Sequence, residues 1–375
     1  MAKLGEVCKV SPSTKNIERQ GAWLLNLDMV EQQTGRVVEY NFVGEDGLNG
    51  SITQFDTENI LYSKLRPNLN KVVLPERNGF CTSELLPLRP DARKLDRSYL
   101  AVFLRSDGFV NWAVSKTAGA KMPRLGTKDL LNANIPLPEI KEQKAIAEKF
   151  EKLEELIFLR KQQIAKLDEL VKAQFVEMFG VVHNSVLYPY VPVKSFTSVV
   201  SGGTPNRNVS EFWNNGSIRW VKTTELQNNV ICNTDEKITQ AGLDNSSAKI
   251  IPPNTVLIAM YGQGKTRGMT GYTSIECATN QACACILPCE QFNQNYLWRY
   301  MILSYDKLRD MAKGGNQPNL NIGIIKNFPV LKPPIELQND FAAFAERVDQ
   351  QKQTIQQSLE KLELMKKALM QEYFG

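Results

Sequence analysis

The sequence lacks long apolar runs. None approaches the roughly 18 consecutive apolar residues that a membrane-spanning helix needs, and the N-terminal MAKLGEVCKV has no apolar signal core. The seven cysteines are an odd number scattered along a long chain, which argues for reduced thiols in a cytoplasm. We therefore expect a cytoplasmic protein without disulfide bonds.

Residues for catalysis are also scarce. The chain has a single histidine, His183, in the segment VVHNSVLYPY and without an evident partner, which disfavours triads that need histidine. An Asp-Pro-Pro-Tyr type motif for adenine methylation is missing, because NQPN and NFPV lack the aromatic that stacks a flipped base. These absences predict that the chain is not itself an enzyme.

The chain does have length and an uneven charge distribution. Its 375 residues exceed what one hydrophobic core usually fills, so two or more domains are expected. The net charge is +5, but residues 141–180 carry 8 basic and 8 acidic side chains, and residues 336–375 carry 5 and 7. Subtracting these from 45 and 40 leaves 32 basic and 25 acidic residues elsewhere, an excess of +7. The positive charge that could attract a nucleic acid lies outside these two stretches.

One unit of sequence occurs twice in tandem. KMPRLGTKDLLNANIPLPEIKEQ (121–143) aligns without a gap with NQPNLNIGIIKNFPVLKPPIELQ (316–338), at a constant offset of 195. The same offset places Phe179-Gly180 on Phe374-Gly375, the end of the sequence. Upstream the offset drifts by one or two residues, as for Tyr99-Leu100 on Tyr296-Leu297 and NILYS (59–63) on TVLIA (255–259). A shared fold with variable loops is implied.

A long amphipathic helix is predicted after the prolines of each unit. The prolines of NIPLPEI and VLKPPI end the preceding region, and apolar residues then recur at the 4-3 spacing of a heptad seam. The seam residues are Ile146, Phe150, Leu153, Ile157, Ile164, Leu167, Val171 and Met178 in the first unit, and Phe341, Ala345, Val348, Ile355, Leu359, Leu362, Leu369 and Tyr373 in the second. Arg160, Gln174, Lys352 and Lys366 take the remaining seam positions.

At about 1.5 Å per residue, either helix would be roughly 55 Å long. Each seam could pack against its own domain. Because there are two of equal length, they most economically pack on each other as an antiparallel pair, which would hold the globular parts at opposite ends of a rigid spacer.

The regions before each helix are typical of mixed α/β domains. Short β-type runs such as SIRWV, TVLIAMY and ACACIL are separated by Gly, Asn, Pro and Asp clusters, and helical pieces occur at 96–114 and 293–311. The sequence thus predicts an α/β (mixed α+β) chain of four parts, which are a first globular domain (1–140), a long helix (141–180), a second globular domain (181–335) and a second long helix (336–375).

This tandem order resembles the specificity subunits of type I restriction-modification systems over essentially all 375 residues. The most specific pieces are the junctions NIPLPEIKEQKAIAEKF and NFPVLKPPIELQNDFAAF. The segments SGGTPNRNVSEFWNNGSIRWVKTTEL and TDEKITQAGLDNSSAKIIPPNTVLIAMYGQGKTRG are similar to a target-recognition domain of this family. The first domain is less typical, because its NILYSKLRPNL lacks the glycines of TVLIAMYGQGK.

The resemblance implies that each globular domain binds one half of a bipartite, asymmetric target in double-stranded DNA. The paired helices would set the spacing between the halves, two methyltransferase subunits would dock alongside, and restriction-translocation subunits would join them. S-adenosylmethionine and ATP with magnesium would belong to those partners, so this chain would hold no cofactor and no metal.

DNA contacts need phosphate donors and forked or amide side chains on loops that can enter a groove. The segment Tyr261 to Arg267 meets these needs, since its glycines let the backbone approach closely. The alternative is a solvated turn for most candidates and a merely structural role for the matched segments GAKMPR (119–124) and GGNQPN (314–319). In the first domain the candidates are Lys64, Arg66, Asn68, Lys71, Lys121 and Arg124, and in the second they are Arg207, Lys222, Thr223, Thr224, Tyr261, Gln263, Lys265, Thr266, Arg267, Asn316 and Gln317.

Three other interpretations fit less well. AMYGQGKT (259–266) satisfies a relaxed phosphate-loop pattern, but RGMTGYTSIECA follows it instead of a helix. Cys277, Cys283, Cys285 and Cys289 are crowded, but their spacing is poor for a metal, and a buried cysteine usually acts as a small apolar residue. A purely structural coiled-coil protein would leave the +7 excess and the glycine-lysine loop without a role.

Overall fold

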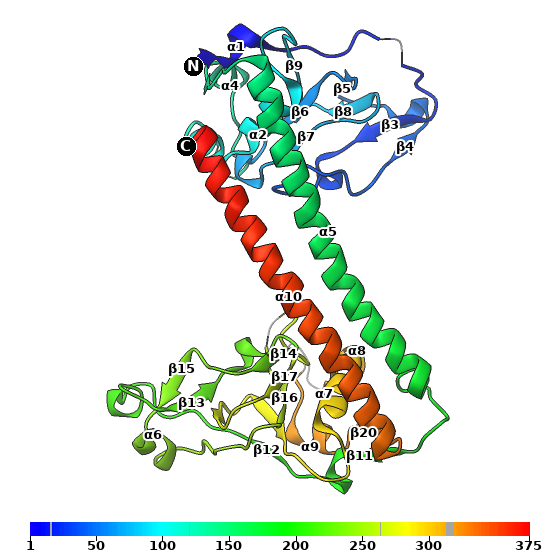
Figure 1. The fold of residues 1–375 in the computed structure, drawn as a ribbon, viewed down its shortest axis with the longest axis vertical. Coiled ribbons are helices and arrows are strands. Elements are labelled where there is room, and N and C mark those ends of the chain that lie inside the picture. The colour runs from blue at the N-terminus through cyan, green and yellow to red at the C-terminus, as the bar shows by residue number, and fades with distance from the viewer. Residues whose placement is uncertain (16, 120, 263, 313–318) are drawn as a thin grey trace. The chain divides into compact units, whose positions relative to one another are not determined.

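The computed structural model describes residues 1–15, 17–119, 121–262, 264–312 and 319–375. They form two compact units (Figure 1). Unit 1 comprises Met1–Gln162 and Gln356–Gly375, and unit 2 comprises Gln163–Ile355. Each unit therefore combines one globular domain with a segment of each long helix.

Unit 1 contains two four-stranded sheets, in the orders β2-β9-β6-β7 and β4-β3-β8-β5, and the short pair β1-β10. The strands are β1 (Ala2–Lys3), β2 (Cys8–Val10), β3 (Ala22–Leu25), β4 (Phe42–Val43), β5 (Ile52–Phe55), β6 (Ile60–Ser63), β7 (Val72–Val73), β8 (Gly79–Thr82), β9 (Leu85–Pro90) and β10 (Asn134–Ile135). The helices of the domain are α1 (Leu4–Val7), α2 (Arg97–Arg105), α3 (Asp107–Ser115) and α4 (Thr127–Leu131).

Unit 2 contains a five-stranded sheet in the order β12-β19-β16-β17-β14, a three-stranded sheet β15-β13-β18, and the pair β11-β20. The strands are β11 (Tyr190–Pro192), β12 (Val199–Ser201), β13 (Ile218–Val221), β14 (Asn229–Ile231), β15 (Glu236–Ile238), β16 (Val256–Ala259), β17 (Thr270–Thr273), β18 (Ala278–Thr279), β19 (Cys283–Ile286) and β20 (Pro329–Leu331). The helices of the domain are α6 (Gln240–Asp244), α7 (Gln294–Leu303), α8 (Tyr305–Asp310) and α9 (Ile322–Lys326).

The two domains share one topology, which confirms the internal repeat. In unit 1, β6 lies between β9 and β7 as an antiparallel neighbour of both. In unit 2, β16 lies in the same way between β19 and β17. An equivalent parallel strand pair also occurs in each domain, β3 with β8 and β13 with β18, and the second domain adds the parallel pair β14 with β17. The mixed α/β fold predicted from the alternating runs is therefore present twice.

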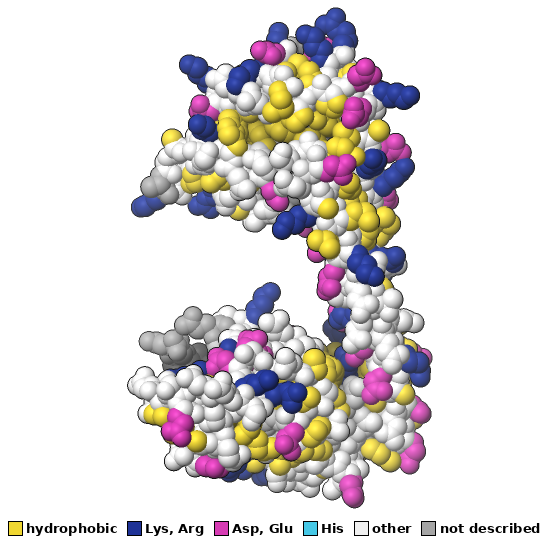
Figure 2. Space-filling model, turned by 60° about the vertical axis from the view of Figure 1, so that its left-hand side comes forward, with side chains coloured by type: hydrophobic (Ala, Val, Ile, Leu, Met, Phe, Trp, Pro, Cys, Tyr) yellow, Lys and Arg dark blue, Asp and Glu magenta, His cyan; other side chains and the backbone are white. Residues whose placement is uncertain are grey.

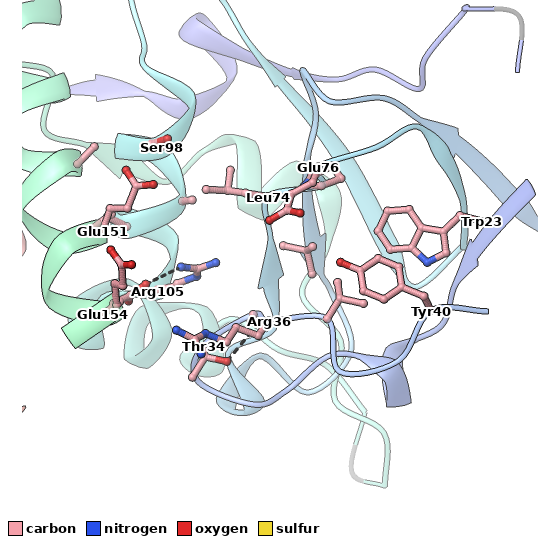
Figure 3. A pocket seen from close by; sticks show the side chains of 18 residues that line it. Trp23, Thr34, Arg36, Tyr40, Leu74, Glu76, Ser98, Arg105, Glu151 and Glu154 are labelled. Carbon is pink, nitrogen blue, oxygen red and sulfur yellow. Dashed lines mark hydrogen bonds and ion pairs between the residues drawn. The ribbon is translucent and has the colours of Figure 1, made fainter. Parts of the chain in front are cut away.

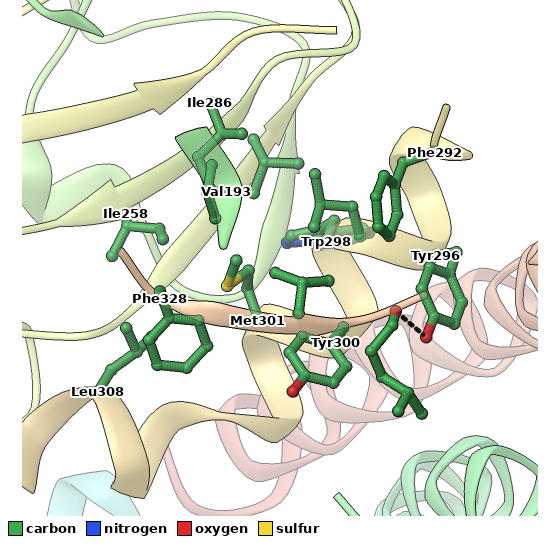
Figure 4. Packing of buried hydrophobic residues seen from close by; sticks show 14 of the residues in the cluster. Val193, Ile258, Ile286, Phe292, Tyr296, Trp298, Tyr300, Met301, Leu308 and Phe328 are labelled. Atoms are coloured by element: carbon green, nitrogen blue, oxygen red, sulfur yellow. Dashed lines mark hydrogen bonds between the residues drawn. The ribbon is translucent and has the colours of Figure 1, made fainter. Parts of the chain in front are cut away.

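A capped helix packs on the main sheet of each domain. The carboxylate of Asp96 accepts a hydrogen bond from the Tyr99 amide at the start of α2, and Asn293 accepts the matching bond from Tyr296 at the start of α7. Both tyrosines are fully buried in the core. The Tyr99 hydroxyl donates to the Pro136 carbonyl and the Tyr296 hydroxyl to the Leu331 carbonyl, and each acceptor lies a few residues before a long helix. Figure 4 shows Tyr296 and its neighbours in the core of unit 2.

The long helices are α5 (Ile140–Phe179) and α10 (Ile335–Phe374), each of 40 residues. All predicted seam residues are buried or half-buried. In unit 1, Lys366 of α10 pairs with Glu154 of α5 at 2.7 Å, and in unit 2, Lys352 pairs with Asp168 at 2.6 Å. Residue numbers fall along one helix as they rise along the other, so the pair is antiparallel. The two seam lysines therefore carry ion pairs across the helices.

The ends of the two helices use equivalent residues. In unit 2, the ring of Phe179 at the end of α5 lies 5.3 Å from that of Tyr296. In unit 1, the ring of Phe374 at the end of α10 lies 5.3 Å from that of Tyr99. In unit 1 the end of α10 thus packs in the same core as the start of α5, and in unit 2 the end of α5 packs in the same core as the start of α10.

A buried glutamine joins each domain to the start of its long helix. Gln143 accepts a hydrogen bond from the Asp96 amide and donates to the carbonyls of Lys94 and Pro138. Gln338 accepts from the Asn293 amide and donates to a proline carbonyl in the same way. The aligned glutamines in the sequence therefore mark one polar joint that is built twice.

Cysteine and hydropathy features complete the description. All seven cysteines are free thiols, and Cys277, Cys283 and Cys285 lie in one apolar core cluster, where burial raises the pKa of Cys285 to about 12. Among the described residues, no helix is both long enough and apolar enough to cross a membrane.

Candidate DNA interface

The glycine-lysine loop of the second domain connects two strands of the main sheet. It begins after β16 and ends before β17, so a strand follows it where a phosphate loop would need a helix. Gly262, Gly264 and Gly268 have φ angles of +149°, +59° and +87°, which side chains rarely adopt. The glycines are therefore required by the shape of the loop.

Side chains of helix α8 form hydrogen bonds with the backbone of this loop. The Tyr305 hydroxyl donates to the carbonyl of Lys265 at 2.7 Å, and the Arg309 guanidinium donates to the carbonyls of Gly264 and Arg267. Tyr261 and Lys265 are exposed, and Thr266 and Arg267 are half-buried. Helix α8 thus holds the backbone at Gly264, Lys265 and Arg267, while the side chain of Lys265 is exposed to solvent.

The segment before the second long helix lies beside this loop, because the Leu320 amide donates to the Met260 carbonyl at 3.1 Å. Gln263, Asn316 and Gln317, which the sequence also nominates, lie outside the described residues.

The first domain brings its two candidate loops together through two backbone bonds, the first of which is equivalent to that between Leu320 and Met260. The Leu125 amide donates to the Lys64 carbonyl at 2.9 Å, and the Arg66 amide donates to the Pro123 carbonyl at 2.8 Å. The Arg66 guanidinium also reaches the Lys121 carbonyl at 3.5 Å. Lys64, Arg66, Lys121 and Arg124 therefore belong to one pair of adjacent loops, which the sequence alone did not predict.

Some candidates in the first domain already have partners. The Lys71 ammonium donates to the Leu27 carbonyl, so its charge is used inside the domain, and burial lowers its pKa. Arg124 pairs with Glu84 at 2.8 Å, and this bond lowers the pKa of the carboxyl. Asn68 is exposed, and its carbonyl accepts a bond from Gln33. Their contacts with DNA stay predictions.

A second group in the second domain combines two candidates with an acid. Glu236 pairs with Arg207 and, at 2.9 Å, with Lys222, and both bonds lower the pKa of its carboxyl. The Arg207 guanidinium also lies 3.7 Å over the ring of Trp213. Thr223 and Thr224 lie in the short 3-10 turn Thr223–Glu225 that follows. Arg207 is half exposed, so this group presents an arginine in a fixed position.

The sequence did not reveal the groups that hold these side chains. Glu84, Glu236, Tyr305 and Arg309 lie far from their partners in sequence and carry no motif. The sequence predicted only that Tyr305 and Arg309 lie in a helical segment, 293–311. His183, which seemed to lack a partner, lies with its Nδ1 3.2 Å from the Tyr300 hydroxyl, and burial lowers its pKa. That environment is part of the core of unit 2.

The face drawn in Figure 2 does not show one continuous basic patch. On the face drawn in Figure 2, Lys and Arg side chains are scattered over both globular parts and are interspersed with Asp and Glu. Individual loops, and not a broad field, therefore carry the case for DNA contacts.

The chain contains two copies of one α/β domain. Each copy is joined to a long helix and carries adjacent polar loops, which is the arrangement of a recognition protein with two binding domains. The chain belongs to the family of the type I restriction modification DNA specificity domain, whose model matches residues 1–169 and 188–364. Members of this family are specificity subunits, which are the non-catalytic subunits of their systems.

Two curated relatives come from Escherichia coli. The chain is 31% identical to the type I restriction enzyme EcoDI specificity subunit over 124 residues, which are 33% of this chain and 27% of the relative. It is 27% identical to the EcoR124I/EcoR124II specificity subunit over 152 residues, or 40% of this chain and 37% of the relative. The matched segments thus span about a quarter to two fifths of these relatives.

Two solved structures match the whole chain in fold. The S subunit of a type I restriction-modification system from M. genitalium has a TM-score of 0.60 at 14% identity, covering 100% of this chain and 95% of that one. A chain from a structural study of complex assembly and conformational transition in the type I restriction-modification system has a TM-score of 0.60 at 17% identity, covering 100% and 96%. At these identities the likeness shows the fold.

Proposed function

We propose that this chain is the sequence-reading subunit of a type I restriction-modification complex and that each globular domain binds one half of an asymmetric, two-part DNA target. The observation that carries the proposal is that one scaffold is built twice with different loops. The glutamine joint and one backbone bond between the loops recur, but Lys64 and Arg66 stand where the second domain has a glycine-rich loop with Lys265. Shared scaffolds with different reading loops are what an asymmetric target requires.

The partners in this proposal are double-stranded DNA, two methyltransferase subunits that dock along α5 and α10, and restriction-translocation subunits. S-adenosylmethionine and ATP with magnesium would be bound by those subunits in the cytoplasm. The helix pair would set the spacing between the two half-sites. Exposed apolar side chains on the helices, such as Leu159 and Leu364, support a docking role, because a partner would remove them from water.

The experiment is selection of random DNA duplexes by the chain purified with its methyltransferase partner, at two salt concentrations. We expect an enriched motif of two short blocks separated by a spacer of fixed length. Selection without any two-part motif would refute the proposal and favour a structural coiled-coil protein. ATP hydrolysis by the chain alone would favour the nucleotide-binding alternative.

Loop variants make the test sharper. Lys64→Ala with Arg66→Ala should weaken or relax one block only, and Lys265→Ala with Arg267→Ala the other block only. If both variants changed the same block, the assignment of one half-site to each domain would be wrong.

A further inference from the structure

A short turn in unit 2 joins the three loops that carry its candidate DNA contacts. It comprises Asn280, Gln281 and Ala282, and it connects β18 of the three-stranded sheet with β19 of the main sheet. None of these three residues is among the candidates that the sequence supplies. The position of the turn in the fold, and not a motif, relates it to DNA.

Two of the loops are bonded to the start of the turn. The Gly203 amide donates to the Thr279 carbonyl at 2.9 Å and so holds the loop that leads to Arg207. The Asn280 amide donates at 3.0 Å to the carbonyl of Val221, the last residue of β13. The segment with the candidates that follow β13 is therefore fixed to the same turn.

The third loop is bonded to the end of the turn. The Met260 amide donates to the Ala282 carbonyl at 2.8 Å, and the glycine-lysine loop follows Met260 directly. Unit 1 has the equivalent bond, from the Lys64 amide to the Glu84 carbonyl at 3.0 Å. The turn thus belongs to the scaffold that the two domains share.

The side chain of Gln281 is fixed at one atom and open at the other. Its Oε1 accepts a hydrogen bond from the Thr204 hydroxyl, while its Nε2 has no hydrogen-bond partner among the described residues. The side chain is exposed to solvent. It therefore presents two N–H donors and one free lone pair of its oxygen from a fixed position. Because Thr204 already restricts the side chain, less rotamer entropy remains to be lost on binding.

Unit 1 has no such side chain at this place. Its turn between β8 and β9 has two residues, Ser83 and Glu84, where that of unit 2 has three. The carboxylate of Glu84 is bonded to Arg124 at 2.8 Å. The additional residue in unit 2 therefore gives the second domain a free amide that the first domain lacks, as expected of two domains that bind different half-sites.

A cavity of about 570 Å³ in unit 1 offers no counterpart of Gln281 (Figure 3). Among the described residues that line it, none is an asparagine or a glutamine. Arg105 is bonded to Glu154 at 3.2 Å, and Tyr40 lies against Trp23. These side chains are thus engaged within the domain.

We propose that Gln281 is a base-reading residue of the second domain and that it recognises an adenine. In the major groove, adenine presents N7 as an acceptor and its N6 amino group as a donor. The Nε2 of Gln281 donates to N7, and the second lone pair of Oε1 accepts from the N6 amino group. This assignment rests on the proposed function, because it specifies one contact within the half-site that the second domain binds.

Selection of random duplexes by variants of the chain, each purified with the methyltransferase partner, tests the assignment. Gln281→Ala should lose the preference for adenine, about tenfold in relative affinity, at one position of one block. Gln281→Glu should change the preference at that position to cytosine, whose N4 amino group donates to a carboxylate. Gln291→Ala is the matched control, because Gln291 is also exposed and its Oε1 also accepts one bond, from Lys332, but it follows β19 instead of preceding it. This control should select the wild-type motif.

A modified base tests the contact itself. A duplex with 7-deazaadenine at the assigned position lacks the N7 acceptor, so it should bind the wild-type chain about fivefold more weakly than the unmodified duplex. The Gln281→Ala variant should bind the two duplexes equally. Equal weakening in both proteins would mean that another residue contacts N7 and would overturn the proposal.

The remaining outcomes separate this assignment from the proposed function. If the wild type selected a two-part motif and Gln281→Ala selected the same one, Gln281 would not read a base, but the proposed function would stand. The same conclusion follows if Gln281→Ala weakened binding to all sequences alike, as loss of a phosphate contact would. If the wild type selected no two-part motif, the proposed function and this assignment would both be refuted.

Discussion

At the scale of residues, the same side-chain type has different tasks according to its surroundings. Arg89 binds the buried carboxylate of Asp56, whereas Arg66 lies exposed in a left-handed conformation on a candidate loop. Lys71 donates into the domain, whereas Lys265 extends from a loop whose backbone is tied to α8. Burial and partners, more than residue identity, therefore separate structural cations from those available to DNA.

Asp56 provides a prediction about stability. Its side chain is 1% exposed and accepts hydrogen bonds from Arg89 and Ser13, each at 2.7 Å. Burial alone would raise the pKa of this carboxyl, but the bonds from Arg89 and Ser13 hold it well below its ordinary value. We expect Asp56→Asn to lower the free energy of unfolding by about 3 kcal/mol at neutral pH, measured by urea denaturation, because Arg89 loses its buried charge partner and retains the exposed carboxylate of Glu58.

The pH dependence follows from the direction of that shift. A depressed pKa stabilises the fold above the ordinary carboxyl pKa, and the contribution is lost as pH falls through the folded pKa. The difference between wild type and Asp56→Asn should therefore shrink as the pH is lowered toward and below roughly 3. A difference that stays constant on acidification would contradict this account.

Lys265 gives a prediction about DNA. If it neutralises a phosphate, Lys265→Ala should weaken binding to all sequences alike and reduce the slope of log affinity against log salt by about 1. Lys194→Ala, at an exposed lysine of the 3-10 turn Val193–Ser195, is the matched control and should leave the slope unchanged. Loss of discrimination at one base pair, with an unchanged slope, would instead make Lys265 a base-reading residue.

The sequence could identify loops but not their supports. Glycines and basic residues between two β-type runs predict an exposed loop, and the structure has such a loop after β16. The tie from Arg309 to that loop joins residues more than 40 positions apart, and the pairing of Glu236 with Arg207 spans 29. Such contacts depend on how the chain folds back, which local patterns do not encode.

At the scale of elements, the two long helices were the part of the fold that the sequence predicted best. The reason is that apolar residues at heptad spacing directly mark the buried face of a helix. The two helices begin at Ile140 and Ile335, at the end of the proline segments. The pattern alone left open whether each seam packed on its own domain or on the other seam. Both occur, since Phe150 and Phe374 share a core with α2, and Lys366 pairs with Glu154 across the helices.

The glutamine joint yields a prediction for these elements. Gln143 and Gln338 are fully buried, and replacing either with leucine would leave one backbone amide and at least one carbonyl without a partner. We expect each substitution to lower the free energy of unfolding by about 2–4 kcal/mol, measured by urea denaturation. Gln357→Leu, at an exposed position of α10, should change it by less than about 0.5 kcal/mol. A small effect at Gln143 with a large one at Gln338 would mean that the two joints are not equivalent.

At the scale of the whole molecule, each compact unit is made from parts of both repeats. Unit 1 includes the end of α10, and unit 2 includes the end of α5, so neither repeat by itself contains a complete unit. Both long helices thus contribute to both units, and their length is the feature that we expect to relate the two proposed half-sites.

This arrangement predicts how the DNA spacer depends on the helices. Removing one heptad from α5 and the facing heptad from α10 keeps the antiparallel seam in register, because facing positions such as Asp168 and Lys352 then remain paired. Seven residues correspond to about 10 Å of helix, or about three base pairs of DNA. In duplex selection, the double deletion should shorten the spacer by about three base pairs and leave both sequence blocks as they were. A changed block with an unchanged spacer would show that the helices take part in reading bases and do not set the distance between two independent readers.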